Sequence, residues 1–252
     1  EAIHHPRGLS LPGPWSDVHG PHLTLLASED LPANDLGGPA NHNSQSISQV
    51  SRGEAMTDLS AELAQQKQKL REKLRFRRKH FAANLDGMAQ LAAFRALPAP
   101  LSELLAGHAV IGAYAAWGDE PDIMPMFASL AEAGALALPH HAGRVDEMTF
   151  RRWHPGESLA KGPWSTRQPA DDASMATPDL IFCPLVGFDR RGGRIGQGGG
   201  HYDRYFAAHP AALRIGVGWS VQEIDTVPRE STDITLDAIL TEQEFILCGD
   251  RL

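Results

Sequence analysis

Apolar residues recur along residues 58–83 with the spacing of one helix face. The positions, at intervals of 4, 7, 4 and 7, are Leu59, Leu63, Leu70, Leu74 and Phe81. This period predicts an amphipathic helix over 58–83. A second helix is predicted over 88–96, because Pro98 and Pro100 would end it.

Farther along the chain, short apolar runs alternate with helical stretches. Strands are predicted over 109–116, 135–138, 148–153, 179–186, 214–219 and 235–240. Helices are predicted over 123–133 and 202–208. This alternation is typical of an α/β fold with a largely parallel sheet covered on both faces. Ligands of such sheets bind beyond the carboxyl ends of the strands.

Residues 1–55 differ from the rest of the chain. They are rich in Pro, Gly, Ser, Asn and His and hold no sustained period. We therefore predict a flexible N-terminal extension over 1–55 and a single domain over 56–252. Residues 52–54 are encodable by a purine-rich run resembling a ribosome-binding site, so our hypothesis is that translation starts naturally at Met56. The alternative is a genuine but poorly ordered arm.

Composition narrows the functional class. The chain has 252 residues, of which 42% are hydrophobic and 21% charged, as in ordinary soluble proteins. A net charge of −8 argues against a general nucleic-acid binder, which needs a basic face. The two cysteines, Cys183 and Cys248, favour reduced thiols, and we find neither a membrane-spanning apolar run nor a signal peptide. These features predict a cytoplasmic protein with no nucleic-acid or membrane partner.

The stretch 188–204 carries the strongest functional signal. Four glycines, at 196, 198, 199 and 200, follow the predicted strand 179–186 and precede a predicted helix. Their backbone N–H groups, with the helix start, suit an anion. Arg194 and Arg204 add positive charge, and Asp203 is a carboxylate of the kind that binds Mg²⁺. The pattern indicates a triphosphate held with its metal.

Neither common phosphate motif fits this stretch. There is no G-x-x-x-x-G-K-[ST], and the two possible G-x-G-x-x-G registers fail at Ile195 and His201. The alternative is a plain glycine-rich turn between strand and helix.

Lys67 and Arg71 share one face of the first predicted helix. Lys67 also falls within the apolar stripe, so it either snorkels to solvent or reaches into a site. Composition alone favours snorkelling.

Two acids stand at informative positions. Glu120 follows the strand 109–116, where it suits either a ligand site or the acidic start of a helix at Pro121. Asp237 lies within an apolar run and needs an ion pair or a metal. Histidine and cysteine spacings exclude a zinc site. The tryptophans and Tyr114 suit either ligand stacking or the core.

The sequence resembles the 5-formyltetrahydrofolate cyclo-ligase family, also called 5,10-methenyltetrahydrofolate synthetase. The matching pieces span 57–247 in family order. They are Lys67-x-x-Leu70-Arg71, 114–120, Leu138-Pro139, 162–169, 179–204, Leu236-Asp237 and Thr241-Glu242. Of these, the run 188–204 is highly specific.

The resemblance implies a single three-layer α/β/α domain with a mostly parallel mixed sheet. It implies ATP as co-substrate, Mg²⁺ as cofactor, and cyclisation of 5-formyltetrahydrofolate to 5,10-methenyltetrahydrofolate through a phosphorylated imidate, with release of ADP and phosphate. We expect a monomer.

The resemblance also implies roles for individual residues. Lys67, Arg194 and Asp203 would be catalytic, and Lys67 would face phosphates instead of solvent. ATP would contact Lys67, Arg71, Arg194, Gly196, Gln197, Gly198, Gly199, Gly200, Tyr202 and Asp203. The folate would contact Ala115, Glu120, Trp164 and His201, and Mg²⁺ would be carried by Asp203 and Asp237.

The chain departs from the family at His201, where many members have the first tyrosine of Tyr-Tyr-Asp. Two alternatives to the cyclo-ligase stay open at this point. One is an ATP-dependent enzyme with a different substrate, and the other is a non-catalytic folate- or nucleotide-binding regulator.

Overall fold

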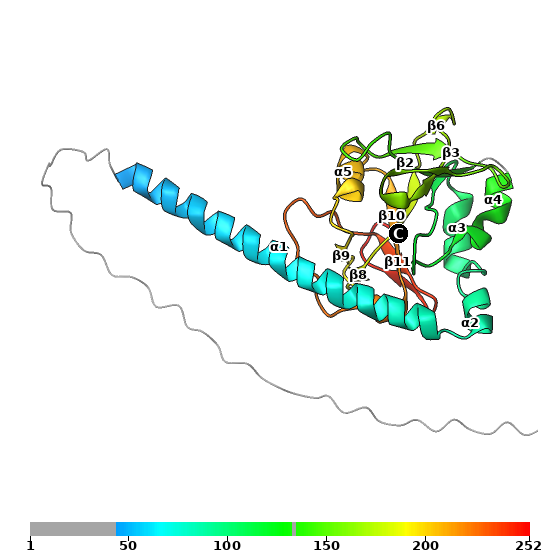
Figure 1. Cartoon of the computed structure of the whole chain (residues 1–252), viewed down its shortest axis with the longest axis horizontal. Helices are drawn as coiled ribbons and strands as arrows, with labels where there is room; N and C mark the ends of the chain where they lie inside the picture. Colours follow the sequence, from blue (N-terminus) through cyan, green and yellow to red (C-terminus); the bar gives the residue numbers. More distant parts are fainter. Residues whose placement is uncertain (1–43, 133–134) are drawn as a thin grey trace, which may run out of the picture. The chain divides into compact units, whose positions relative to one another are not determined.

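An eight-stranded sheet forms the centre of the domain (Figure 1). The computed structural model describes residues 44–132 and 135–252. The sheet order is β12 (Phe245–Leu247), β11 (Ala238–Leu240), β10 (Leu213–Val217), β7 (Leu180–Pro184), β1 (Ile111–Gly112), β2 (Leu136–His140), β3 (Thr149–Arg152) and β6 (Met175–Ala176). The five strands from β11 to β2 are mutually parallel, whereas β12, β3 and β6 are antiparallel to their neighbours. The prediction of a mostly parallel mixed sheet is confirmed.

Alternate residues of the central strands pack on opposite faces of the sheet. Leu180 and Phe182 of β7 join one core cluster, with Leu101 of α3 (Ala99–Ala106). Their neighbours Ile181 and Cys183 join a second cluster, with Phe206 of α5 (His201–Ala208). Figure 1 shows α3 and α4 (Ala128–Glu132) on one side and α5 on the other. The domain is therefore a three-layer α/β/α structure.

The long helix α1 (Ser44–Asn84) lies along the domain and seals a third, smaller core cluster. Leu74 of α1 packs there with Val186, Ile195 and Val227. The predicted start of this helix at 58 is wrong, since the helix already runs from Ser44. A helix is predicted from apolar residues at helical spacing, and 44–57 hold no such stripe. The helix passes through the predicted boundary at 55/56, and residues 1–43 of the predicted extension lie outside the described residues.

The prolines expected to end a helix instead begin one. The helix α2 (Gly87–Ala92) is shorter than predicted and is capped by the Asp86 carboxylate, which accepts from the N–H groups of Met88 and Ala89. Pro98 then caps α3, which carries Pro100 in its first turn. A proline costs little there, because those N–H groups have no partner within the helix. The predicted helix 123–133 is a 3₁₀ turn η1 (Met124–Phe127) followed by α4.

A hairpin that the sequence analysis did not predict lies between β7 and the glycine run. It consists of β8 (Gly187–Phe188) and β9 (Arg194–Ile195). The buried Asp189 carboxylate closes its turn by accepting from the N–H groups of Arg191 and Gly193. Burial raises the pKa of Asp189, but these bonds and one from Val227 outweigh it and hold the pKa below its usual value.

A further hairpin and a last 3₁₀ turn complete the domain. The strands β4 (Ala160–Lys161) and β5 (Arg167–Gln168) form a separate hairpin around η2 (Pro163–Ser165). A last 3₁₀ turn, η3, covers Ser220–Gln222.

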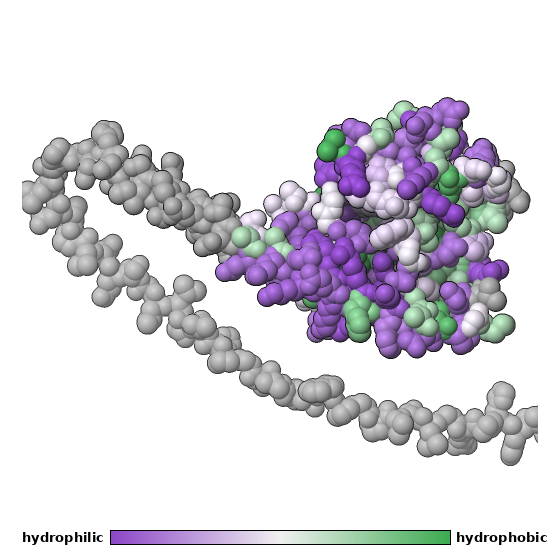
Figure 2. All heavy atoms as spheres, viewed as in Figure 1, coloured by the Kyte–Doolittle hydropathy of each residue, from purple (hydrophilic) through white to green (hydrophobic). Residues whose placement is uncertain are grey.

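Figure 2 shows a largely hydrophilic surface over α1. Within the described ranges, no helix combines the length and apolar character needed to cross a membrane.

Candidate active site

A cavity of about 410 Å³ opens beyond the carboxyl ends of the parallel strands. Pro184 at the end of β7 and Ala115 in the loop after β1 form part of its wall, with the glycine run opposite. All four residues expected to contact folate line it: Ala115, Glu120, Trp164 and His201. So do seven of those expected to contact ATP: Arg194, Gly196, Gln197, Gly199, Gly200, Tyr202 and Asp203. The two groups of predicted residues thus meet at one pocket.

Trp164 reaches the pocket on a strained loop. It lies between β4 and β5 with a φ of 58°, and Ser165 follows with a φ of 64°. Two successive non-glycine residues in the left-handed region are costly and occur chiefly at functional loops. The Thr166 hydroxyl holds the turn by donating to the Pro163 carbonyl at 2.7 Å. The indole is more than a third exposed and forms a flat wall of the cavity.

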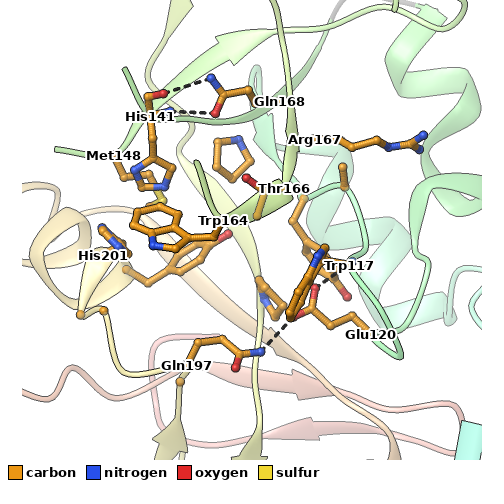
Figure 3. A pocket seen from close by; sticks show the side chains of 18 of the residues that line it. Trp117, Glu120, His141, Met148, Trp164, Thr166, Arg167, Gln168, Gln197 and His201 are labelled. Carbon is orange, nitrogen blue, oxygen red and sulfur yellow. Dashed lines mark hydrogen bonds between the residues drawn. The ribbon is translucent and has the colours of Figure 1, made fainter. Parts of the chain in front are cut away.

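Two histidine rings meet the indole of Trp164 (Figure 3). The centroids of His141 and His201 are 4.6 Å apart, and both rings lie within 5.4 Å of Trp164. Gln168 anchors the His141 backbone by donating to its carbonyl and accepting from its N–H. Burial lowers the pKa of His141 to about 4, with His201 adding to the effect. Burial and Arg204 also lower the pKa of His201.

Glu120 lies on the loop after β1, which two hydrogen bonds fix. The Tyr114 hydroxyl donates to the Pro121 carbonyl at 2.8 Å, and Trp219 Nε1 donates to the Asp119 carbonyl at 3.0 Å. The Glu120 carboxylate accepts from the Trp117 N–H at 3.1 Å and from Gln197 at 3.4 Å (Figure 3). Burial raises the pKa of Glu120, and Arg78 opposes that rise.

The glycine run 196–200 rests on α1. Gly198 and Gly200 have φ values of 108° and 64°, which side-chain-bearing residues rarely adopt. Arg71 Nε donates to the Gly196 carbonyl at 3.0 Å, and Arg75 Nη2 donates to the Gln197 side chain at 2.7 Å. Neither Arg71 nor Gly198 lines the cavity, so Arg71 contacts the run from outside, where a side chain at position 198 would meet its guanidinium.

Arg194 and Asp203 pair at the pocket wall at 2.8 Å. The Arg194 guanidinium also lies over the Phe206 ring, 5.3 Å from its centroid. The same oxygen of Asp203 accepts from the Ile234 N–H at 3.1 Å. A cation and a carboxylate are therefore held side by side where phosphates and a metal were expected.

Lys67 and Asp237 lie away from the cavity. Lys67 is buried against acids of the segment 230–233, so it does not snorkel to solvent. Asp237 accepts from the N–H of Arg214, the second residue of β10, at 2.9 Å and pairs with Arg251 at 3.2 Å. The structure therefore does not bring Asp237 together with Asp203.

A metal at this site would have Asp203 as its protein ligand at the pocket. Within residues 44–132 and 135–252, no group of three or more His, Cys, Asp or Glu side chains is arranged to hold a metal ion. Mg²⁺ commonly uses one or two carboxylates and takes its other ligands from phosphates and water. Asp203 beside the glycine run fits that pattern.

Sequence reasoning missed Arg75 and Arg78. Together with Lys67 and Arg71 they continue one face of α1 at spacings of four, four and three residues. Arg78 Nη1 lies 3.7 Å from Glu120 Oε1, with both side chains buried. The spacing was available in the sequence, but no role was predicted for the basic residues among 75–79.

The chain is similar to several known proteins. A model of the 5-formyltetrahydrofolate cyclo-ligase family matches residues 63–242. The 5-formyltetrahydrofolate cyclo-ligase of Escherichia coli (strain K12) is 30% identical over 162 residues, covering 61% of this chain and 87% of the relative. That of Mus musculus is 26% identical over 139 residues, covering 49% and 68%.

Two solved structures are also similar. The 5,10-methenyltetrahydrofolate synthetase of Aquifex aeolicus has a TM-score of 0.59 and 26% identity, covering 73% of this chain and 93% of that one. The synthetase of Mycoplasma pneumoniae, at 20% identity and a TM-score of 0.54, covers 70% and 98% and supports the fold alone.

Proposed function

The chain belongs to the 5-formyltetrahydrofolate cyclo-ligase family, and we propose that it converts 5-formyltetrahydrofolate to 5,10-methenyltetrahydrofolate with ATP and Mg²⁺. One observation carries the proposal. A single cavity of about 410 Å³ has aromatic walls suited to a flat ring and a glycine-rich wall suited to phosphates.

The glycine side of the cavity would bind ATP, the co-substrate. Backbone N–H groups of 196–200 and the start of α5 would face its phosphates, with Arg194 and Tyr202 beside them. Arg71, already on the Gly196 carbonyl, and Lys67 would add positive charge from α1. Asp203 would hold Mg²⁺, which screens phosphate charge when bound.

The aromatic side would bind the folate. Trp164 and His201 offer ring faces to the pterin, and Ala115 leaves room for it. The Glu120 carboxylate would accept from N–H donors of the pterin edge. His201 replaces the tyrosine common in the family, so it retains an aromatic face and changes the polar contact.

The proposed reaction has two steps and needs no protein nucleophile. The formyl oxygen attacks the γ-phosphorus, giving a phosphorylated imidate and ADP. The folate nitrogen at position 10 then attacks the imidate carbon and releases its proton to solvent, closing the ring as phosphate leaves. Positioning and charge neutralisation supply most of the catalysis in phosphoryl transfer, which suits the fixed loop and its arginines.

We also propose a cytoplasmic monomer that binds neither nucleic acid nor membranes. Cys183 and Cys248 are both free thiols, as expected of a reducing compartment. Size-exclusion chromatography with light scattering tests the monomer.

An absorbance assay for the methenyl product tests the function. Purified protein is incubated with 5-formyltetrahydrofolate and Mg²⁺, with ATP present or omitted. We expect product only with ATP, and ADP in equal amount. Product formed without ATP contradicts the proposal. Absence of product, with folate or ATP still bound, favours the regulator or an enzyme for another substrate.

A further inference from the structure

Arg78 is a buried cation with unsatisfied nitrogens. Its side chain on α1 is only 5% exposed, and Nε and Nη1 are buried without a hydrogen-bond partner. Leaving donors of a charged group unpaired in the interior is costly, and such groups in native structures call for an explanation.

The acid that faces Arg78 is Glu120. Arg78 Nη1 lies 3.7 Å from Glu120 Oε1, too far for a good hydrogen bond but close enough for a strong charge interaction. Arg71 and Arg75, on the same face of α1, instead contact the glycine run. Arg78 therefore acts on the folate side of the cavity, not the phosphate side.

We infer that Arg78 is a positioning residue for folate binding, which keeps Glu120 ionised inside the pocket so that both carboxylate oxygens can accept N–H donors of the pterin. The inference rests on the proposed function, since it assumes that Glu120 contacts the folate.

The environment of Glu120 explains why such a cation is needed. Burial raises the pKa of Glu120, and Arg78 is the nearby charge that lowers it. Tyr114 and Tyr202 also face Glu120, but burial raises the pKa of both well above the usual value, so both are neutral at physiological pH. Gln197 donates one long hydrogen bond and carries no charge. A protonated Glu120 would turn one acceptor into a donor and mismatch the pterin edge.

Folate binding measured against pH tests the inference. Calorimetric titration of 5-formyltetrahydrofolate between pH 5.5 and 8.5 compares the wild type with Arg78→Met and Arg78→Gln. If the pKa of Glu120 rises by one unit, folate binding should weaken by up to about tenfold at pH values below the new pKa. In both variants we expect folate affinity at neutral pH to fall. The midpoint of its pH dependence should move to higher pH, and ATP affinity should not change. Arg78→Lys, which keeps the charge, should restore most of the wild-type profile. The exposed neighbour Arg77→Met is the matched control and should match the wild type.

A double-mutant cycle separates an effect through Glu120 from direct contact or simple packing. In a Glu120→Gln background, which has no ionisable group at this position, Arg78→Met should weaken folate binding no further. An additional loss there, or an unmoved midpoint in both neutral Arg78 variants, overturns the inference. So does failure of both neutral variants to fold while Glu120→Gln folds. A wild type that binds no folate instead overturns the proposed function.

Discussion

Lys67 donates to Asp233 at 2.5 Å and lies 3.3 Å from Glu230, joining α1 to a segment 166 residues farther along the chain. The lysine is buried, while the two acids are partly exposed. ATP phosphates would have to draw the ammonium from these acids or share it with them.

Lys67→Ala should therefore weaken both ATP binding and the fold. Loss of a desolvated phosphate contact costs on the order of 2–4 kcal/mol, or roughly thirty- to several-hundred-fold in the KM for ATP. The matched variant Asp233→Asn should lower the melting temperature without raising that KM. If both variants lose the same stability and neither changes the KM for ATP, Lys67 contributes to packing and does not bind ATP.

Trp164→Gly should separate strain from binding. Glycine adopts the left-handed conformation freely, so relief of strain should offset lost packing, and the free energy of unfolding should change by no more than about 1 kcal/mol. Loss of the stacking surface should weaken folate binding by about 1–3 kcal/mol, the range for aromatic side chains that stack on bases. The KM for folate should rise accordingly.

Ser165→Gly is the control for Trp164→Gly. It relieves a similar strain at a residue that does not line the cavity. We expect stability equal to the wild type or higher, with an unchanged KM for folate. Equal KM increases in the two variants would mean that loop rigidity, not the indole, governs binding.

Acid pH should destabilise the protein through protonation of His141. Burial lowers its pKa to about 4, below the value of about 6.5 expected in the unfolded chain. The unfolded state therefore takes up the proton more readily between these values, so stability decreases as pH falls from about 6.5 to about 4. His141→Phe should flatten this part of the pH profile of chemical denaturation, whereas the exposed His154→Gln should not. An unchanged slope in His141→Phe would contradict the expectation.

Much of the central sheet was predictable because its strands are short apolar runs between polar turns. The run 179–186 contains β7, and 214–219 overlaps β10 with ends displaced by one or two residues. The helix α3 was missed because prolines end one helix and begin another with equal ease. The start of α1 was missed because a helix segment without an apolar stripe leaves no periodic signal.

The site was predictable where the signal is local. Gly196, Gly199 and Gly200 of the glycine run line the same pocket as Trp164, which the family resemblance gave to the folate. The partners of Lys67, Arg78 and Asp237 lie at least 14 residues away in sequence, so no local sequence pattern predicts these contacts. Only the packing of α1 on the domain reveals that Arg78 is buried and Arg77 is not.

Removal of residues 1–55 should leave an active enzyme. Among the described side chains of α1, Leu63 is the first that is even partly buried, and every proposed site residue lies beyond it. We expect a melting temperature and kcat/KM close to the wild type, with a stability change of about 0.5 kcal/mol or less. Deletion of 1–43 is the matched control, because it keeps α1 whole. Loss of solubility in the longer deletion alone would assign 44–55 to the domain.

Asp203→Asn should change the Mg²⁺ requirement, whereas Asp237→Asn should change stability, although the family resemblance implies that both residues bind Mg²⁺. Asp203 lines the cavity beside Arg194, so its amide variant should raise the Mg²⁺ concentration needed for half-maximal rate and lower turnover. Asp237 is held by Arg251 and the Arg214 N–H, so its variant should lose stability instead.

The size and control of the Asp237 effect follow from its partners. Weakening a partly exposed pair and a charged hydrogen bond should cost about 1–3 kcal/mol of unfolding free energy. Arg251→Met should reproduce part of that loss, since it removes the other half of the pair. Titration of activity with Mg²⁺, beside urea denaturation, measures both quantities. If Asp237→Asn raises the Mg²⁺ requirement as much as Asp203→Asn does, Asp237 must leave Arg251 when ATP binds, and both acids hold the metal.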